Sequence, residues 1–312
     1  MAEVDKKILT IAVVTYNQGH TIRECISSIA LQTYSEIDLV IVDDYSCDFK
    51  KNEIESYIRS LNRSFCSVSV EGFCEHKGIV AAYNRALELA KGEYVLFIAG
   101  DDFLSSVDVL DRLADVLRKC ERIDILQGKA VLLPQRKELP DETLQELVDD
   151  KNIPALLKRT LDQPFCQLMC IQSALIRTDW LLENGGFASN YQYVVDWPIY
   201  LKALNDAALF DFCDVAVTDM QGEGAFRSVG FGQLYLRKGY FREVACTIRE
   251  FLLAGNKNPV QKYELECIAR TYEHKVIYDT EWCYYSFFDR IKWRMKTLKR
   301  FYMAKKESKH NG

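Results

Sequence analysis

An apolar segment that ends in two adjacent carboxylates constrains this chain more than any other feature. Residues 94–99 read Tyr-Val-Leu-Phe-Ile-Ala and lead through Gly100 to Asp101 and Asp102. A run without polar alternation suits a strand buried on both faces of a sheet. Mg²⁺ and Mn²⁺ prefer oxygen ligands and bridge to substrate phosphates, so the pair is a candidate metal site. The alternative is an ordinary helix N-cap.

The same pattern occurs earlier, where residues 39–42 lead to Asp43 and Asp44. Segments with helical periodicity lie between the strands. The first of them begins after Thr21, which we expect to form a capping box with Glu24. The resulting order predicts an α/β, Rossmann-like fold with a mostly parallel central sheet, flanked by helices and joined by right-handed crossovers. Ligands bind such sheets at the carboxyl ends of the strands, so both acidic pairs should face one functional edge. The expected strands are 8–14, 39–42, 67–70 and 94–99, and the expected helices begin near 22 and span 79–91.

In the second half of the chain the expected helices and strands no longer alternate regularly. We expect a first domain over residues 1–230, built from one part at about 8–128 and another at about 129–230. Residues 231–312 should form a helical C-terminal region. The expected elements are a helix at 108–120, a strand at 123–127, a loop-and-helix insertion at 133–163, a strand at 167–176, a helix from 197 to 204, a strand at 210–219 and a glycine-rich loop at 222–232.

The charge distribution and the cysteine spacing argue against several classes of protein. The formal net charge of −5 hides a C-terminal segment, 287–312, with a net charge of +7, which leaves −12 on residues 1–286. An acidic body argues against broad nucleic-acid binding. The eleven cysteines show no Cys-x-x-Cys and the four histidines are scattered, so zinc is not expected. No signal peptide or membrane-length apolar run is evident, which predicts a reduced, cytoplasmic protein.

The turn after the first strand narrows the ligand class. Residues 15–19 lack both the G-x-G-x-x-G of dinucleotide enzymes and the G-x-x-x-x-G-K-[ST] of P-loop proteins. Three features remain. Tyr16 supplies an aromatic ring, and Asp43 or Asp44 supplies a carboxylate that can accept a hydrogen bond from a base or a ribose. The acidic pair Asp101 and Asp102 lies deeper. This set is suited to a nucleoside diphosphate held through a divalent cation.

At these residues the chain resembles family 2 glycosyltransferases. The resemblance covers about residues 8–225 and implies a GT-A fold, a nucleotide-sugar donor, a divalent metal and inversion at the anomeric carbon. It implies that residues 1–230 are a catalytic domain, with nucleotide-sugar binding at about 8–128 and the acceptor and base part at about 129–230. Its motifs, in order, are Ile-Ala-Val-Val-Thr-Tyr-Asn at 11–17, Ser-Ser-Ile-Ala-Leu-Gln-Thr at 27–33, Val-Ile-Val-Asp-Asp-Tyr-Ser-Cys-Asp at 40–48, Ala-Tyr-Asn-Arg-Ala at 82–86, and Gly-Glu-Tyr at 92–94 leading to the second acidic pair.

The resemblance also implies roles for individual residues. Tyr16 would stack on a uracil-type base and Asp44 would hydrogen-bond it, with the other nucleotide contacts at Thr15, Asn17 and Gly78. Asp102 would be the main metal ligand, and Asp101 would lie nearer the ribose while sharing the metal. Ala99 stands where many members have an aspartate, so the Asp-x-Asp form is replaced by Gly-Asp-Asp.

The catalytic base of the family follows a Gly-Gly-Phe turn, here residues 185–187. Asp196 matches its position, and Val195 replaces the preceding glutamate of the usual pair. An inverting transfer needs such a carboxylate to take the proton of the acceptor hydroxyl. The alternative is that Asp196 only caps the helix that begins at Trp197, where Pro198 suits the first turn.

Other polar residues are less specific. Arg227, in a loop resembling the one that closes over the diphosphate, would offset leaving-group charge or else be a solvated surface residue. Arg85 and His76 are expected to be surface or helix-face residues, and Asn84 to support the framework.

The basic C-terminal segment permits two interpretations. An aromatic stripe on a helix with lysines elsewhere predicts either contact of residues 282–306 with an anionic membrane, at its inner face, or packing on the catalytic domain. The stripe is formed by Tyr284, Phe287, Phe288, Ile291, Met295, Leu298 and Tyr302.

Together with these patterns, the resemblance implies an inverting glycosyltransferase that uses a UDP-sugar and Mn²⁺ or Mg²⁺, with a glycan or lipid-linked saccharide as acceptor. One alternative is a sugar nucleotidyltransferase, although residues 15–21 lack the basic glycine-rich loop that grips a triphosphate. The other is a non-catalytic nucleotide-sugar-binding scaffold, which Ala99 and Val195 would favour. The oligomeric state does not follow from the sequence.

Overall fold

The structure is a computed structural model that describes residues 7–120, 122–134, 136–139, 170–205, 208–221, 238–253, 266 and 269–270 of the 312-residue chain. The chain divides into two compact units, residues 1–229 and 230–312. The sheet lies in the first unit. In the second, the described helix is α10 (Lys238–Leu253), where helical structure was predicted.

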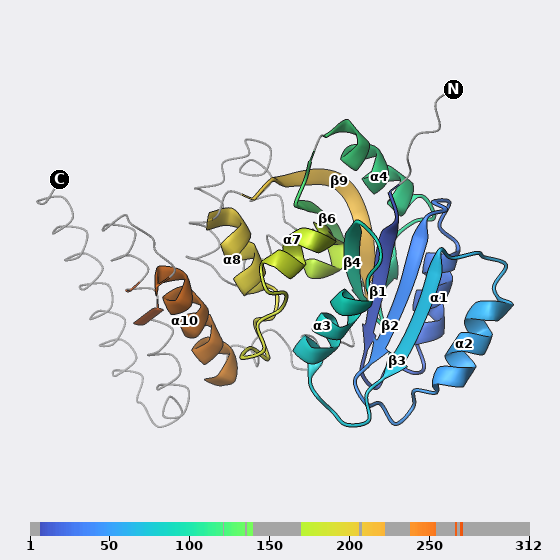
Figure 1. Cartoon of the computed structure of the whole chain (residues 1–312), viewed down its shortest axis with the longest axis horizontal. Helices are drawn as coiled ribbons and strands as arrows, with labels where there is room; N and C mark the ends of the chain where they lie inside the picture. The colour runs from blue at the N-terminus through green and yellow to red at the C-terminus, as the bar shows by residue number, and fades with distance from the viewer. Residues whose placement is uncertain are drawn as a thin grey trace, which may run out of the picture. The chain divides into compact units, whose positions relative to one another are not determined.

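Four parallel strands form the first half of the sheet, in the order β3-β2-β1-β4 (Figure 1). Every residue of β1 and β2 is buried, as the apolar runs predicted. Helices connect the strands, so the predicted α/β fold is confirmed. The elements are β1 (Leu9–Thr15), α1 (Ile22–Ala30), β2 (Ile37–Asp43), α2 (Lys51–Ser60), β3 (Ser67–Gly72), α3 (Ile79–Leu89) and β4 (Tyr94–Ala99).

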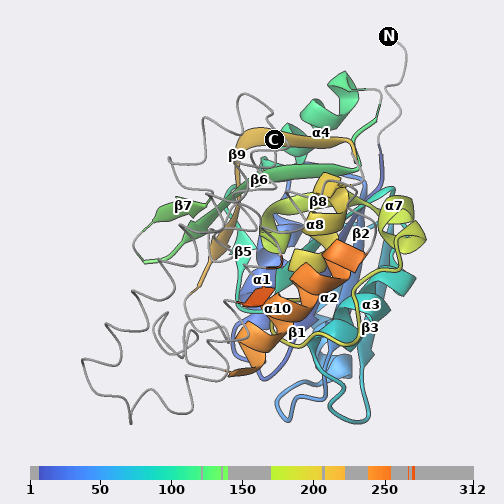
Figure 2. The same cartoon turned by 90° about the vertical axis from the view of Figure 1, so that its left-hand side faces the viewer.

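The second half of the sheet is mixed in direction. β8 (Ala174–Arg177) is antiparallel to both β4 and β6 (Ile125–Leu132). β9 (Phe210–Met220) runs parallel to β6 and pairs antiparallel with the short β5 (Phe103–Leu104). β7 (Lys137–Leu139) forms a hairpin with β6 (Figure 2). Because β5 follows β4 closely in the chain and pairs with β9, the end of β9 lies beside the residues that follow β4.

The predicted strand at 167–176 is corrected by the structure. Residues 171–173 form a 3-10 turn, η1 (Ile171–Ser173), and the strand begins only at Ala174. Ser173 donates both its N–H and its hydroxyl to the carbonyl of Cys170, at 3.0 and 3.2 Å, which closes the turn. Residues 167–169, and 140–163 of the predicted insertion, lie outside the described part of the chain.

Helices cover both faces of the sheet and bury two separate apolar clusters (Figure 1). α1, α2 and α4 (Val109–Lys119) pack on one face, against alternate residues of β1 such as Ile11 and Val13. α3, α7 (Thr178–Glu183) and α8 (Trp197–Asn205) pack on the other face, against Ala12 and Val14. Both clusters are anchored by the central strands, which hold the carboxyl edge of the sheet in place. Within the described residues no helix is long and apolar enough to cross a bilayer.

The start of α1 differs from the predicted capping box. Thr21 occupies the N-cap position, but its hydroxyl makes no cap hydrogen bond. Instead the hydroxyl donates to the carbonyls of Gln18, at 3.2 Å, and Gly100, at 2.9 Å. Tertiary contact therefore replaces local capping and fastens α1 to the turn that carries the second acidic pair.

A buried carboxylate joins three segments at the amino edge of the sheet. Asp38 in β2 is fully buried and accepts hydrogen bonds from the hydroxyls of Thr10, at 2.7 Å, and Ser67, and from the backbone N–H of Lys91, at 2.9 Å. The Thr10 hydroxyl accepts in turn from the N–H of Gly92, at 2.8 Å. The network fixes the start of β4 against β1 and β2.

We expect Asp38→Ala to lower the free energy of unfolding by about 2–4 kcal/mol, because buried donors lose their acceptor. Urea denaturation of the full chain measures this. Glu88→Ala is the control, since Glu88 pairs with Arg85 at an exposed site and should cost less than about 1 kcal/mol. Equal losses in the two variants would contradict a structural role for the Asp38 network.

Candidate active site

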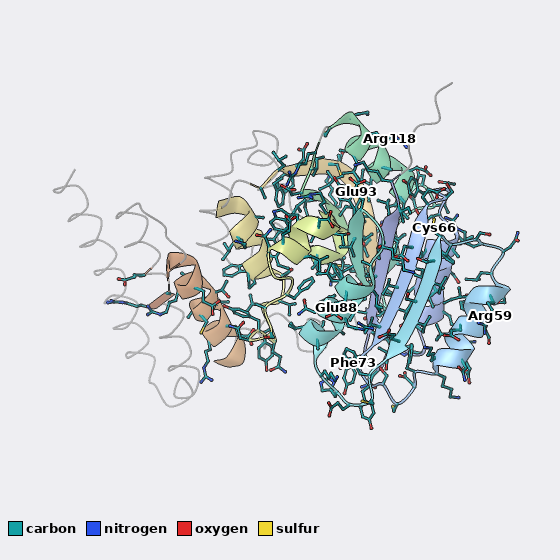
Figure 3. All side chains as sticks on the ribbon, in the orientation of Figure 1. Arg59, Cys66, Phe73, Glu88, Glu93 and Arg118 are labelled. Atoms are coloured by element: carbon teal, nitrogen blue, oxygen red, sulfur yellow. The ribbon has the colours of Figure 1, made fainter. Side chains whose placement is uncertain are left out.

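The carboxyl ends of β1, β2 and β4 meet at one edge of the sheet. Thr15 pairs with Asp43, and Val14 pairs with Ala99. In Figure 3, Phe73, which follows β3, lies at this edge, whereas Glu93 and Cys66, which precede β4 and β3, lie at the opposite edge. Both acidic pairs therefore follow strands that end at the same edge, as predicted.

The turn after β4 holds its two carboxylates in a buried position. Asp101 and Asp102 are 5% and 3% exposed. The N–H of Gly100 lies 3.2 Å from the carbonyl of Val14 and 3.1 Å from Oε1 of Gln18. A Cβ at Gly100 would lie 2.7 Å from Oγ1 of Thr15, so this position requires glycine.

The acidic turn also contacts the end of β9. Oδ1 of Asp102 accepts the backbone N–H of Gln221 at 2.9 Å. The N-cap alternative for this pair is wrong, because α4 begins only at Val109 with Asp108 in the N-cap position. The two carboxylates are thus placed by tertiary contacts rather than by a helix start.

The donor set of this turn fits a cation shared with a diphosphate. Among the described residues no group of three or more His, Cys, Asp or Glu side chains could hold a metal by itself. Mg²⁺ usually takes one or two protein carboxylates and completes its octahedron with phosphate oxygens and water. Asp101 and Asp102 would hold such an ion, and it would neutralise charge on the diphosphate.

The acidic pair at the end of β2, Asp43 and Asp44, splits into two structural roles. Asp43 accepts the N–H of Ser46, at 2.8 Å, and its hydroxyl, and burial raises the pKa of Asp43. Asp44 is 2% exposed and accepts the N–H groups of Lys77, at 2.7 Å, and Gly78, at 2.9 Å. Gly78 has a φ of 90°, a conformation that favours glycine.

The segment after β1 brings the remaining predicted nucleotide contacts to the same place. The carbonyl of Thr15 accepts the N–H of Asp44 at 3.0 Å. Asn17 has a φ of 55° and donates its N–H to the hydroxyl of Ser46 at 2.7 Å. Tyr16 is 48% exposed, and its ring centroid lies 4.6 Å from that of His76. The structure thus gathers Thr15, Tyr16, Asn17, Asp44 and Gly78 within one loop cluster.

His76 belongs to this cluster and, with its side chain 52% exposed, is also the surface residue that the sequence predicted. Its Nδ1 lies 3.0 Å from Oδ2 of Asp44. A signal for this placement was present in the sequence, because His76 lies two residues before Gly78 in the loop that precedes α3. This contact joins residues 32 positions apart, which local pattern alone does not show.

Asp196 directly precedes α8 and is half-buried. Its backbone carbonyl accepts the N–H groups of Ile199 and Tyr200, and its carboxylate accepts those of Asp196 and Trp197. Burial raises the pKa of Asp196 to about 6, and the two backbone hydrogen bonds only partly oppose that shift. A carboxylate in this state suits proton acceptance near neutral pH, and contacts at the helix start do not conflict with that role.

Two buried side chains connect Asp196 electrostatically with the acidic turn. Burial raises the pKa of Tyr83, and the charges of Asp196, Asp102 and Asp101 raise it further. Burial likewise raises the pKa of Cys170 to about 12, with Asp196 and Asp102 contributing. Because the same two groups feel both carboxylates, Asp196 and Asp102 lie in one electrostatic neighbourhood.

The Gly-Gly-Phe turn before Asp196 is held by Asn84, which confirms the predicted framework role. Asn84 donates Nδ2–H to the carbonyl of Phe187 and accepts its N–H at Oδ1, both at 2.8 Å. Gly186 has a φ of 65°, and a Cβ there would lie 2.7 Å from Asn84 Oδ1. Phe187 stacks on Tyr83 with centroids 4.9 Å apart. The loop that leads to Asp196 therefore starts from a fixed point on α3.

The two predicted arginines differ in what the structure shows. Arg85 binds Glu71 through Nε and Nη2, at 2.7 and 2.8 Å, so it is the helix-face residue that was predicted. Arg227 lies outside the described residues, and its phosphate role stays a prediction. The same holds for the tail segment 282–306.

Comparison with known proteins agrees with this geometry. Residues 10–133 match the model of glycosyl transferase family 2. A PGL/p-HBAD biosynthesis glycosyltransferase of Mycobacterium bovis is 24% identical over 207 residues, which cover 65% of this chain and 72% of the relative. These matches and the fold define the class: over residues 10–133 the chain is similar to glycosyl transferase family 2, and the protein is a glycosyltransferase.

Two solved structures share the fold. Staphylococcus aureus TarS 1–349, in complex with UDP-GlcNAc, has a TM-score of 0.62 at 21% identity and covers 95% of this chain and 81% of that one. The mannosyltransferase PcManGT from Pyrobaculum calidifontis, in complex with GDP-Man and Mn²⁺, has a TM-score of 0.59 at 16% identity and the same coverage. The central fold is therefore GT-A, as predicted.

Proposed function

We propose that this glycosyltransferase transfers a sugar, with inversion, from a UDP-sugar to a hydroxyl of a glycan or lipid-linked saccharide. The observation that carries the proposal is the gathering of both acidic pairs at one sheet edge, with Asp196 in the electrostatic neighbourhood of Asp102. The UDP-GlcNAc and GDP-Man complexes of the two structural neighbours support a nucleotide-sugar donor, and the Mn²⁺ in one of them supports a divalent metal. The biosynthetic name of the mycobacterial relative supports a role in glycan assembly.

Each group then has one task in the transfer. The loop cluster of Tyr16, Asp44 and Gly78 binds the nucleoside. Asp101 and Asp102 would hold the cation, which would neutralise charge on the diphosphate. Asp196 takes the proton of the acceptor hydroxyl while that oxygen bonds to the anomeric carbon. The bond from this carbon to the diphosphate oxygen breaks in the same step, and the nucleoside diphosphate leaves with the electron pair.

Equilibrium binding tests the donor part of the proposal. Calorimetric titration with UDP-sugars, GDP-sugars and dTDP-sugars, each with and without Mn²⁺, should show metal-dependent binding that is tightest for a UDP-sugar. A donor affinity that is the same with and without Mn²⁺ would contradict the proposed role of the metal. A preference for GDP- or dTDP-sugars would contradict the choice of nucleotide. No binding by any of them would contradict the proposal as a whole.

A further inference from the structure

The peptide group of Gly100 is held from both ends by one short segment, residues 18–21. Its N–H lies 3.1 Å from Oε1 of Gln18, and its carbonyl accepts a hydrogen bond from the hydroxyl of Thr21 at 2.9 Å. The two side chains are joined through their own backbone, since the N–H of Thr21 donates to the carbonyl of Gln18 at 3.1 Å. The segment and the peptide therefore form one closed hydrogen-bonded unit, although 79 residues separate Thr21 from Gly100.

The acidic turn takes its position from this peptide group, because Asp101 and Asp102 follow Gly100 directly in the chain. The turn closes on itself through the N–H of Asp102, which donates to the carbonyl of Ala99 at 3.1 Å. The same carbonyl lies 3.6 Å from the thiol of Cys25, in α1. The backbone of the turn is thus fastened to the start of α1, and a rotation of the Gly100 peptide would carry both carboxylates with it.

Gln18 and Thr21 have no other task in the proposed transfer. Thr21 stands at the N-cap of α1 but makes no cap hydrogen bond, so its hydroxyl contacts the acidic turn instead of its own helix. Gln18 starts α1 with its backbone carbonyl, which accepts the N–H groups of Thr21 and Ile22, and its side chain remains for Gly100. Groups that orient a metal ligand from outside the coordination sphere commonly set the affinity for the metal.

We propose that Gln18 and Thr21 are positioning residues that set how strongly the acidic turn binds its divalent cation, because they hold the Gly100 peptide. The inference rests on the proposed nucleotide-sugar function and goes beyond the family resemblance, which assigns no role to either residue. Thr21 donates to the peptide carbonyl and Gln18 accepts from the peptide N–H, so the pair opposes rotation in both directions. A turn that is fixed before the ion arrives loses less conformational freedom when the ion binds.

The test measures how much Mn²⁺ strengthens the binding of UDP. UDP is titrated calorimetrically into the full-length wild type, Thr21→Val and Thr21→Ser, once with saturating Mn²⁺ and once with EDTA, and the ratio of the two affinities is the gain from the metal. Thr21→Val keeps the shape of the side chain but removes the donor. We expect its gain to fall about tenfold or more, the usual cost of removing a group that orients a metal ligand, while its affinity in EDTA is unchanged. Thr21→Ser keeps the hydroxyl and should restore the gain.

Three further variants complete the design, and urea denaturation shows that each is folded. Gln18→Leu tests the same peptide from its N–H side, and its gain should fall less, because the carbonyl of Val14 still lies 3.2 Å from that N–H. Asp102→Asn should lose the gain altogether. Glu24→Gln is the matched control, since Glu24 is exposed and lies three residues beyond Thr21 in α1, and it should keep both affinities. If Thr21→Val does not fold, Gln18→Leu carries the test.

The possible failures are distinguishable. If Mn²⁺ strengthens UDP binding equally in the wild type, Thr21→Val and Gln18→Leu, the positioning role is wrong while the proposed function stands. If Thr21→Val lowers the affinities with Mn²⁺ and with EDTA by the same factor, Thr21 supports the whole loop, which also contradicts the inference. If Mn²⁺ does not strengthen UDP binding to the wild type, or UDP does not bind at all, the proposed function and the inference are both wrong.

Discussion

Asp196→Asn is expected to reduce sugar transfer by about 10²–10⁴-fold while donor binding is retained, because the variant lacks a proton acceptor at the acceptor hydroxyl. The amide oxygen of asparagine can still accept the N–H groups of Asp196 and Trp197 that the carboxylate accepts now. The local structure should therefore survive. Initial rates of transfer and calorimetric donor binding, measured on the same preparation, check both parts.

The pH dependence of the wild type gives an independent test of this base. Burial raises the pKa of Asp196 to about 6, so the group is a carboxylate above that pH and is protonated below it. We expect kcat/KM to fall roughly tenfold per pH unit below about pH 6. The fall should be absent from the residual activity of Asp196→Asn. A profile that is identical in wild type and variant would contradict the assignment.

The stability of Asp196→Asn shows whether a lower rate reflects the missing base or a less stable fold. The folded-state pKa of Asp196 lies above the ordinary value of 3.8, so the folded state binds the proton more tightly than the unfolded state does. This contribution to stability is fully present below about pH 3.8 and is lost as the pH rises through about 6. At pH 7 the asparagine variant should thus be at least as stable as the wild type. Asp179→Asn, at an exposed site in α7, is the control and should leave both rate and stability unchanged.

Asp102→Asn is the second change with a large expected effect. Removing the charge that would hold the cation should lower the rate by at least about 10²–10³-fold, the usual cost of losing one group that stabilises developing charge. The asparagine oxygen can still accept the N–H of Gln221, now at 2.9 Å, so the contact with the end of β9 should remain. Rates measured across a Mn²⁺ titration should show that the variant requires far more metal than the wild type or does not respond to it.

Asp108→Asn provides the matched control for the metal assignment. Asp108 is an exposed carboxylate just before α4 that accepts a hydrogen bond from the Ser106 hydroxyl at 2.5 Å. Its loss should change neither the rate nor the Mn²⁺ response. If Asp102→Asn and Asp108→Asn behave alike, the acidic turn after β4 is not the metal site.

The parallel half of the fold could be predicted because its information is local. β1, β2 and β4 are uninterrupted apolar runs, and the acids that follow β2 and β4 had to share an edge once the strands were parallel. The mixed half could not be predicted in the same way. The two-residue β5 exists only because it pairs with β9, more than 100 residues later, and no periodicity marks such a strand.

Within the site, local pattern selected the candidate residues but did not show which contacts the buried carboxylates make. From the residues alone Asp43 and Asp44 were equal candidates, and only the family resemblance selected Asp44. The structure separates them, since Asp43 closes a turn with Ser46 while Asp44 holds the loop after β3. Thr21 shows the same limit, because its hydroxyl bonds the carbonyl of Gly100, 79 residues away, instead of capping its own helix.

The account is tested most directly by release of free UDP from a panel of UDP-sugars, with Mn²⁺ or Mg²⁺, by the wild type, Asp102→Asn and Asp196→Asn in parallel. We predict that the wild type releases UDP from one donor, that EDTA and Asp102→Asn abolish the release, and that Asp196→Asn binds this donor but does not transfer its sugar once an acceptor is supplied. Release that is insensitive to EDTA and to Asp102→Asn would contradict the metal-dependent mechanism. No release from any UDP-sugar, with either metal and with acceptor present, would contradict the proposed donor.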